Sequence, residues 1–310
     1  MCGIFGAIKT GAGNLTLSTI SKIATEQERR GPHAFGYAWI DSEGRLHSYR
    51  QQGRISKNLH LLERMQGAKA IIGHTRYSTH GEPSHLINNH PHPSDGGWIV
   101  HNGVVSNHED LNTNYDLLPS SDCDSETLGL LIESLPGTLL GRVAETIDLV
   151  DRDAPLCLAG IWRGPNRVVI ARRGNPLMKS IGKTGNVYFG SLGRSLPGRA
   201  VEVDQDHAFV FDISKHTCTE QRLRRYRSGR TFAGSGNCMA THSTAAVKRY
   251  SVTEEEDREL AEAAEDILES CDVHLWETTA CCGGDILPVE GDHYICGDCH
   301  RTVTESGVRA

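Results

Sequence analysis

The second residue of the chain is a cysteine, and its type and position allow nucleophilic chemistry. Cys2 follows Met1 and opens the run Cys-Gly-Ile-Phe-Gly at 2–6. Because a small second residue permits removal of the initiator methionine, the mature chain would begin with a thiol beside a free α-amine. A thiol is a weak nucleophile until a base takes its proton, and an α-amine with a pKa of about 7.7–8.0 can serve as that base. Position alone leaves a second interpretation open, in which Cys2 is an ordinary buried residue of a strand.

Three further segments are too polar and too rich in glycine to be plain core. They cover residues 73–81, 101–109 and 121–127. The first two each follow an apolar stretch, at 68–72 and 98–100, so we expect them where strands end and loops begin. Polar groups at strand ends are a common way to build a site on rigid elements.

Together with Cys2, these segments resemble the glutaminase domain of the class II glutamine amidotransferases. That family belongs to the N-terminal-nucleophile hydrolases and includes glucosamine-6-phosphate synthase and amidophosphoribosyltransferase. The match rests on the run at 2–6, on His-Thr-Arg-x-x-Thr-His-Gly at 74–81, on His-Asn-Gly at 101–103, and on an Asp-x-Glu pair at 124 and 126. The resemblance implies an α+β fold, the four-layer αββα sandwich of these hydrolases.

The resemblance also implies a role for each matching residue. Cys2 would attack the side-chain amide of L-glutamine, form a γ-glutamyl thioester and release ammonia. The side-chain amide of Asn102 and the backbone N–H of Gly103 would form the oxyanion hole, where donors stabilise the charge that develops in the transition state. No cofactor is needed for this hydrolysis.

The same resemblance assigns the substrate pocket. Arg76 would bind the α-carboxylate of glutamine, for which a planar guanidinium is a natural partner. Asp124 would pair with the α-ammonium group, and Thr79 and His80 would complete the pocket. A zwitterionic amino acid needs one fixed cation, one fixed anion and an oxyanion site near a thiol, and these residues supply them.

Each of these residues also has a simpler interpretation. Arg76 could be a solvated residue at a strand end, Asn102-Gly103 could form a type I′ hairpin turn, and Asp124 could cap the helix that follows it. Several histidines in this part of the chain could suggest a metal, but no tight ligand spacing joins them and we assign no metal there; the ones considered are His74, His80, His90, His92 and His101.

One position departs from the family pattern. After Arg30-Gly31 the family usually has an aromatic residue or proline followed by aspartate, whereas this chain has Pro32-His33. The missing aspartate is neither the nucleophile nor an oxyanion donor, so activity is not excluded. The departure leaves open how the local loop is held and which acceptor partner it faces.

The elements that must position these residues can be read from hydrophobic spacing. Strands are expected at 2–8, 35–40, 46–51, 68–74 and 97–104, and a second group at 156–162, 167–172, 177–181, 186–190 and 207–213. Helices are expected at 16–29, 125–134 and 138–147. Two groups of strands with helices between them favour a layered α+β architecture over a βαβ repeat.

Composition narrows the classes of function. The 310 residues carry a net charge of −7, which argues against general binding of polyanions, although five arginines between 222 and 230 leave nucleic acid open as a partner. There is no long apolar run that could cross a membrane or form a signal peptide. Four of the ten cysteines lie at 281–299, which favours a reducing cytoplasm and a metal site over a disulfide framework.

We therefore expect a glutaminase domain at 2–228, a linker at 229–252, and a tail at 253–310 that contains an acidic helix and a structure resembling a zinc ribbon. Cys281 and Cys282 would form one knuckle and Cys296 and Cys299 the other, with a hairpin at 286–295 between them. The first knuckle is irregular, because Thr279 stands where a ribbon would have cysteine. A histidine could replace one cysteine as a ligand, the candidates being His274, His293 and His300.

Three hypotheses about function follow. The first is a glutamine amidotransferase subunit that passes ammonia to a separate synthetase, since the residues beyond the glutaminase domain are too few to build an ammonia-consuming domain. The second is a stand-alone amidase that acts on another γ-glutamyl or related amide; the pairing of Arg76 with Asp124 favours free glutamine instead. The third is a non-catalytic adaptor that works through its zinc ribbon, which would have no need of Cys2, Asn102 and Gly103 together.

Overall fold

The computed structural model describes residues 2–78 and 81–225, and the backbone of four short strands near the carboxyl end. The chain divides into two compact units, Met1–Leu260 and Ala261–Ala310, which are taken separately below. Several predicted features lie outside the described residues: Thr79, His80, the linker at 229–252, the acidic helix that follows it, Cys281, Cys282 and Cys299.

The larger of two antiparallel sheets in the first unit contains the amino-terminal strand. Its strands are β1 (Gly3–Ile8), β2 (Ala34–Ile40), β3 (Leu46–Gln52), β4 (Ala70–Arg76), β9 (Met178–Ile181), β10 (Val187–Gly190) and β11 (Val201–Glu202). Their order is β11-β9-β10-β1-β4-β2-β3. Because β1 pairs with β10 on one side and β4 on the other, the start of the chain is held in the middle of a sheet.

The smaller sheet has six strands. They are β5 (His92–Ser94), β6 (Gly97–Gly103), β7 (Leu156–Trp162), β8 (Arg167–Arg173), β12 (His207–Asp212) and β13 (Thr217–Arg222). Their order is β13-β12-β8-β7-β6-β5. The predicted polar segment at 101–103 therefore forms the end of β6, where it pairs with β7.

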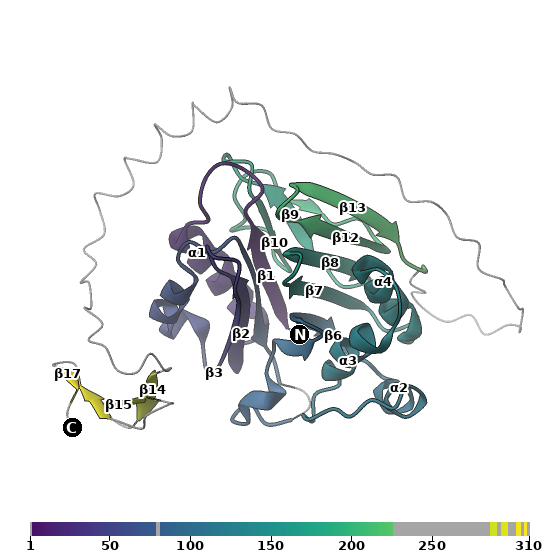
Figure 1. Cartoon of the computed structure of the whole chain (residues 1–310), viewed down its shortest axis with the longest axis horizontal. Helices are drawn as coiled ribbons and strands as arrows, with labels where there is room; N and C mark the ends of the chain where they lie inside the picture. Colours follow the sequence, from purple (N-terminus) through teal and green to yellow (C-terminus); the bar gives the residue numbers. More distant parts are fainter. Residues whose placement is uncertain are drawn as a thin grey trace, which may run out of the picture. The chain divides into compact units, whose positions relative to one another are not determined.

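Helices cover the outer faces of the two sheets (Figure 1). Helix α1 (Leu17–Gln27) packs on the larger sheet, and α3 (Glu126–Ser134) and α4 (Leu139–Leu149) lie beside the smaller one, with α2 (His108–Asn114) next to α3. The result is the expected αββα sandwich. Within the described residues, no helix is long and apolar enough to span a membrane.

Three clusters of buried apolar side chains fill the three spaces between these four layers. The middle cluster joins the two sheets through residues such as Ile4, Ile72, Val100 and Ile170, all with no exposed surface. The outer clusters seat α1 on the larger sheet and α3 and α4 on the smaller one. Burial of apolar surface is the main favourable contribution to folding, so these clusters fix the relative position of the two sheets.

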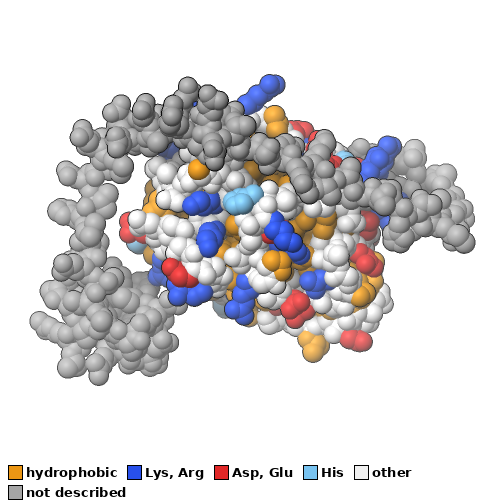
Figure 2. Space-filling view, turned by 45° about the horizontal axis from the view of Figure 1, so that its top comes forward, with side chains coloured by type: hydrophobic (Ala, Val, Ile, Leu, Met, Phe, Trp, Pro, Cys, Tyr) orange, Lys and Arg blue, Asp and Glu red, His pale blue; other side chains and the backbone are white. Residues whose placement is uncertain are grey.

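Most charged side chains lie on the surface, whereas Arg76, Glu126 and Arg173 are buried. On the face seen in Figure 2, lysine and arginine side chains lie scattered among apolar and acidic ones and form no continuous basic patch.

Hydrophobic spacing predicted the long elements and missed the short ones. Strand β13 was not predicted because it is an edge strand with half-buried, mostly polar residues, and α2 was not predicted because Leu111 is its one buried residue. Strands β5 and β11 have only three and two residues. Such elements depend on contacts made by the folded chain and have little periodicity of their own.

The second unit contains a small antiparallel sheet. Its strands are β14 (Ile286–Val289), β15 (His293–Cys296), β16 (Thr302–Thr304) and β17 (Gly307–Val308), in that order. The hairpin expected at 286–295 corresponds to β14 and β15, and Cys296 is the last residue of β15.

A buried arginine ties the end of α4 to the smaller sheet. Arg173, the last residue of β8, has no exposed surface. One terminal nitrogen donates to the carbonyls of Ile147 at 2.6 Å and Val150 at 3.2 Å, and the other donates to those of Asp151 at 2.8 Å and Ala154 at 3.2 Å. The guanidinium thus satisfies carbonyls at the carboxyl end of a helix, where no intrahelical partner exists.

Replacing Arg173 with methionine should lower the free energy of unfolding by about 3 kcal/mol or more, because hydrogen bonds to a charged group contribute ~1.5–3 kcal/mol and their loss leaves buried carbonyls unpaired. The matched control is Arg167→Met on the same strand, where the arginine side chain is 32% exposed. The control should cost less than about 1 kcal/mol. Urea unfolding followed by tryptophan fluorescence measures both, and equal losses would contradict the assigned role.

Candidate active site

Cys2 is fixed by contacts at both its backbone and its side chain. Its carbonyl oxygen accepts a hydrogen bond from Arg30 Nε at 2.7 Å. Its Sγ lies 3.4 Å from the backbone nitrogen of Tyr77, which donates to it, and 3.6 Å from the Tyr77 carbonyl oxygen. Glycine must follow it, because a Cβ at Gly3 would lie 2.6 Å from Thr75 Oγ1. The nucleophile candidate therefore sits beside the end of β4.

The surroundings of Cys2 determine how easily its thiol ionises. Burial raises the pKa of the Cys2 thiol, and the backbone N–H of Tyr77, the positive chain terminus and Arg76 offset part of that rise. Asp124 acts in the opposite direction and raises the pKa. The thiol thus remains protonated at neutral pH, so its attack on a carbonyl carbon requires a base.

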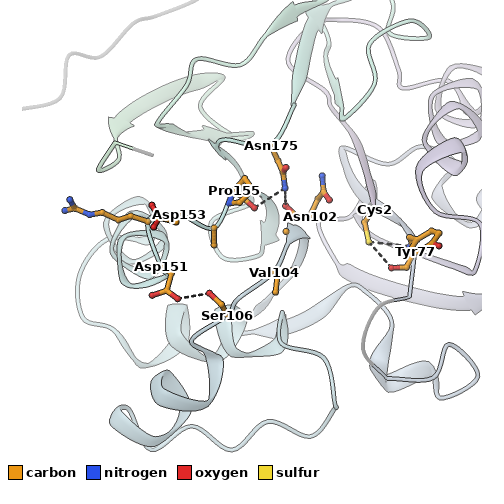
Figure 3. A pocket seen from close by; sticks show the side chains of 12 residues that line it. Cys2, Tyr77, Asn102, Val104, Ser106, Asp151, Asp153, Pro155 and Asn175 are labelled. Atoms are coloured by element: carbon orange, nitrogen blue, oxygen red, sulfur yellow. Dashed lines mark hydrogen bonds between the residues drawn. The ribbon is translucent and has the colours of Figure 1, made fainter. Parts of the chain in front are cut away.

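Asn102 is buried near the end of β6 and only 2% exposed. Its backbone carbonyl accepts a hydrogen bond from Asn175 Nδ2 at 2.8 Å, and Asn175 also binds the carbonyl of Pro155 at 3.1 Å (Figure 3). Its own side-chain nitrogen Nδ2 has no hydrogen-bond partner among the described residues. A buried amide N–H left unpaired costs free energy unless a ligand completes it, so this donor is available to an oxyanion.

Gly103 follows directly and has little space around it. A Cβ at this position would lie 2.7 Å from both His101 Nε2 and the Pro155 carbonyl oxygen, so only glycine fits. Asn102 and Gly103 pair with Cys157 and Leu156 of β7 in the sheet. The alternative of a hairpin turn at Asn102-Gly103 is therefore wrong.

A cavity of about 770 Å³ brings these groups to one surface (Figure 3). Cys2, Tyr77, Asn102 and Gly103 line one part of it, and the segment 151–155 lines another. The carbonyls of that segment are the ones that Arg173 and Asn175 bind. The cavity is large enough for an amino acid and has the nucleophile and the oxyanion donors in its wall.

Arg76 is buried at the end of β4, with 3% of its surface exposed. Its guanidinium donates to Asn89 Oδ1 at 2.7 Å and to the carbonyl of Gly81 at 3.1 Å. The interpretation as a solvated strand-end residue is therefore wrong. Arg76 does not line the cavity itself, but it is near enough to Cys2 to lower the pKa of that thiol.

Asp124 stabilises the loop that follows the oxyanion residues. Its carboxylate accepts a hydrogen bond from the backbone N–H of Val105 at 2.6 Å. Ser125 occupies the N-cap position of α3, so the prediction that Asp124 caps this helix is wrong. Asp124 is not among the residues that line the cavity. The other two predicted substrate-binding residues, Thr79 and His80, lie outside the described residues.

His33, the departure from the family pattern, contacts the loop beside Cys2. Its Nδ1 accepts a hydrogen bond from the backbone N–H of Ser78 at 3.1 Å, and its ring lies 4.7 Å from that of Tyr77. Its backbone N–H donates to the carbonyl of Arg76 at 3.0 Å. A histidine thus holds the loop after β4 directly, without an aspartate.

Sequence reasoning missed Asn175. It follows β8 in the run Arg-Gly-Asn-Pro at 173–176, and both its contacts go to backbone atoms of distant residues, Asn102 and Pro155. The glycine and proline on either side were a turn signal directly after an apolar strand, and that signal could have marked the loop as a support for the site.

Comparison with known proteins agrees with this architecture. No family model matches the chain. The chain is 36% identical to glutamine–fructose-6-phosphate aminotransferase (isomerizing) of Bacillus subtilis over 197 residues, which are 60% of this chain. It is 33% identical to the protein of the same name from Vibrio parahaemolyticus over 239 residues, which are 69% of this chain. The matched parts are 31% and 37% of those two proteins, so the chain spans well under half of their length.

The fold also has a close counterpart among solved structures. The glutamine phosphoribosylpyrophosphate amidotransferase of B. subtilis superposes with a TM-score of 0.59 at 18% identity, over 71% of this chain and 49% of that one. At this identity the likeness supports the fold alone. The comparisons therefore support a domain of the class II glutamine amidotransferase type in the amino-terminal part of this chain, with the αββα fold described above.

Proposed function

We propose that this domain hydrolyses L-glutamine to glutamate and ammonia, and that the ammonia passes to an acceptor held by a partner synthetase. One observation carries the proposal: Asn102, whose buried Nδ2 has no hydrogen-bond partner among the described residues, lines the same cavity as Cys2. A buried donor without a partner, next to a nucleophile, is what acyl transfer through an oxyanion requires.

The chemistry proceeds in two steps. After removal of Met1, the α-amine of Cys2 takes the thiol proton while Sγ attacks the side-chain carbonyl carbon of glutamine. Asn102 Nδ2 and the Gly103 N–H bind the oxyanion, and the protonated amine then donates its proton to the leaving nitrogen, which departs as ammonia. Water attacks the resulting γ-glutamyl thioester, glutamate leaves, and the thiol regains its proton.

The substrate's amino-acid end is assigned to the residues around Arg76. In this proposal Arg76 supplies positive charge for the α-carboxylate and Asp124 negative charge for the α-ammonium, with Thr79 and His80 completing the pocket. Supporting this, Arg76 and Asp124 are both close enough to Cys2 to shift the pKa of its thiol. A second candidate is a stand-alone amidase that acts on another γ-glutamyl or related amide; the pairing of Arg76 with Asp124 favours free glutamine instead.

A separate synthetase subunit is the proposed acceptor of ammonia. The curated relatives carry, in the same chain, more than half of their length beyond the part matched here. Free ammonia is lost to solvent, so delivery requires a partner docked near the cavity. Identification of proteins that co-purify with the full chain tests this; an isolated chain that aminates an acceptor by itself would contradict it.

The tail is proposed to bind a structural zinc ion through Cys281, Cys282, Cys296 and Cys299. The hairpin of β14 and β15 ends at Cys296, as the second knuckle of a ribbon requires. Zinc thiolates can fold a segment too small to have its own core. Zinc analysis of the full chain with these four cysteines changed to serine should show the loss of one bound ion.

Cys2→Ala should abolish glutaminase turnover, because no other thiol of the described residues lines the cavity. The loss should be at least about 10³-fold, as expected when a covalent nucleophile is removed. Cys218→Ala is the matched control, since Cys218 is a half-buried thiol away from the cavity. Ammonia release is measured for both, and activity near wild type in Cys2→Ala would refute the proposed nucleophile.

Asn102→Ala should lower kcat about 10²–10³-fold and change KM little, because an oxyanion donor acts mainly in the transition state. The control is Asn107→Ala, which removes an amide from the segment after β6, outside the cavity lining. Steady-state kinetics with glutamine separate the two constants. An increase in KM at unchanged kcat would assign Asn102 to substrate binding instead.

The pH dependence of kcat/KM should show which group accepts the proton of the Cys2 thiol. Burial raises the pKa of the Cys2 thiol, so few molecules carry a thiolate near neutral pH. The neutral α-amine, with an ordinary pKa of about 7.7–8.0, must then accept the proton, and kcat/KM should rise with pH up to that range and level off above it. A profile already flat from about pH 6 would require a preformed thiolate and would contradict this mechanism.

A further inference from the structure

A cluster of buried histidines lies behind the active site. His74, His90, His92 and His101 are all at most 4% exposed. The rings of His74 and His90 are 3.9 Å apart between centroids, and those of His90 and His92 are 4.6 Å apart. Spacing in the sequence joined none of them into a ligand set, but the fold brings them together.

Two of these histidines meet a cysteine. One nitrogen of His90, one nitrogen of His92 and the Sγ of Cys123 all lie within 4.8 Å of one another, and all three residues are buried. They come from three places in the chain: the segment before β5, its first residue, and the turn before α3. Such convergence of imidazole and thiol groups from separate elements is typical of a metal site.

The polar atoms of this group lack partners. Both ring nitrogens of His90 and the Nε2 of His92 have no hydrogen-bond partner among the described residues. The Cys123 thiol contacts Asp124 Oδ1 at 3.9 Å and also interacts with Ser125. Buried polar groups are almost always paired, so three such nitrogens in one place call for a ligand.

We propose that His90, His92 and Cys123 bind a divalent cation of the zinc type. Nitrogen and thiolate ligands together suit zinc and cobalt and disfavour magnesium and calcium, which prefer oxygen. Zinc bonds of about 2.0–2.3 Å place tetrahedral ligands roughly 3.3–3.8 Å apart, so the three atoms, which lie within 4.8 Å of one another, need to approach by about 1.5 Å at most. Side-chain rotation supplies a change of that size.

Charges of both signs surround the group. Arg50 and Arg76 act on His92, whereas Asp124 acts on Cys123 and Glu126 acts on Arg50. The metal itself would displace the thiol proton of Cys123 and leave a bound thiolate.

A bound ion would stabilise the residues around the substrate site. His90 follows Asn89, whose Oδ1 accepts the hydrogen bond from Arg76, and Cys123 precedes Asp124, which holds the N–H of Val105. The ion would therefore join the segment that contacts Arg76 through Asn89 to the segment that carries Asp124. The proposal concerns binding of the metal and does not depend on the proposed glutaminase activity.

The test is a cobalt titration of the full chain in which Cys281, Cys282, Cys296 and Cys299 are changed to serine, so that the tail contributes no thiolate. Co²⁺ should bind with a single equivalent, give a thiolate-to-cobalt absorption band, and be displaced by Zn²⁺. In this background Cys123→Ser and His92→Gln should each weaken binding at least tenfold. Cys218→Ser should bind like the background chain.

Circular dichroism shows whether each variant is folded. Cys123 and His92 lie in different parts of the fold, so if one of these two variants does not fold, the other still tests the proposal. Zn²⁺ should also raise the thermal midpoint of the background chain and leave that of Cys123→Ser unchanged. Absence of the absorption band in the folded background chain would overturn the proposal and indicate that buried water occupies the cluster. A band that persists in Cys123→Ser would overturn it as well, because the thiolate would belong to another cysteine.

Discussion

The apolar contact between the two sheets is the constraint on which the active site depends. Across this layer β1 contacts β6, so the residue that precedes β1 and the residues that end β6 line one cavity. Neither strand can shift along its sheet without moving a buried side chain to the wrong face, because both lie in continuous antiparallel pairings. The nucleophile and the oxyanion donors are thus positioned by the core and need no mobile element to bring them together.

Behind this contact, polar groups fix the backbone at the edges of the cavity. Arg173 and Asn175, at the end of β8 and just after it, bind carbonyls of the segment 151–155 and of Asn102. Arg30 donates to the carbonyl of Cys2, and the backbone N–H of Tyr77 donates to its Sγ. Most of these contacts run from a side chain to a backbone atom, so they set the direction of the chain and leave the Asn102 amide unpaired. This division explains why the Asn102 amide can remain without a partner in a buried place.

Motifs in the sequence were enough to predict the fold class, the two groups of strands, and Cys2, Asn102 and Gly103 as neighbours. They failed where the outcome depended on tertiary contacts. Asn102-Gly103 could equally have been a hairpin turn, and only its pairing with β7 decides against it. The contacts of Asn175 and the meeting of His90, His92 and Cys123 join residues far apart in the chain or in different elements, and local spacing contains no record of them. His33 shows the reverse case, since a residue that breaks the family pattern still makes the loop contact.

The central claim is that a mature chain beginning at Cys2 carries the nucleophile. Intact-mass analysis before and after treatment with the glutamine-analogue electrophile 6-diazo-5-oxonorleucine, followed by peptide mapping, tests it most directly. With Cys2 as the nucleophile, the chain should lack Met1 and gain a single adduct, on the peptide that begins with Cys2. A chain that retains Met1, or an adduct on Cys123, Cys157 or Cys218 in place of Cys2, would contradict it.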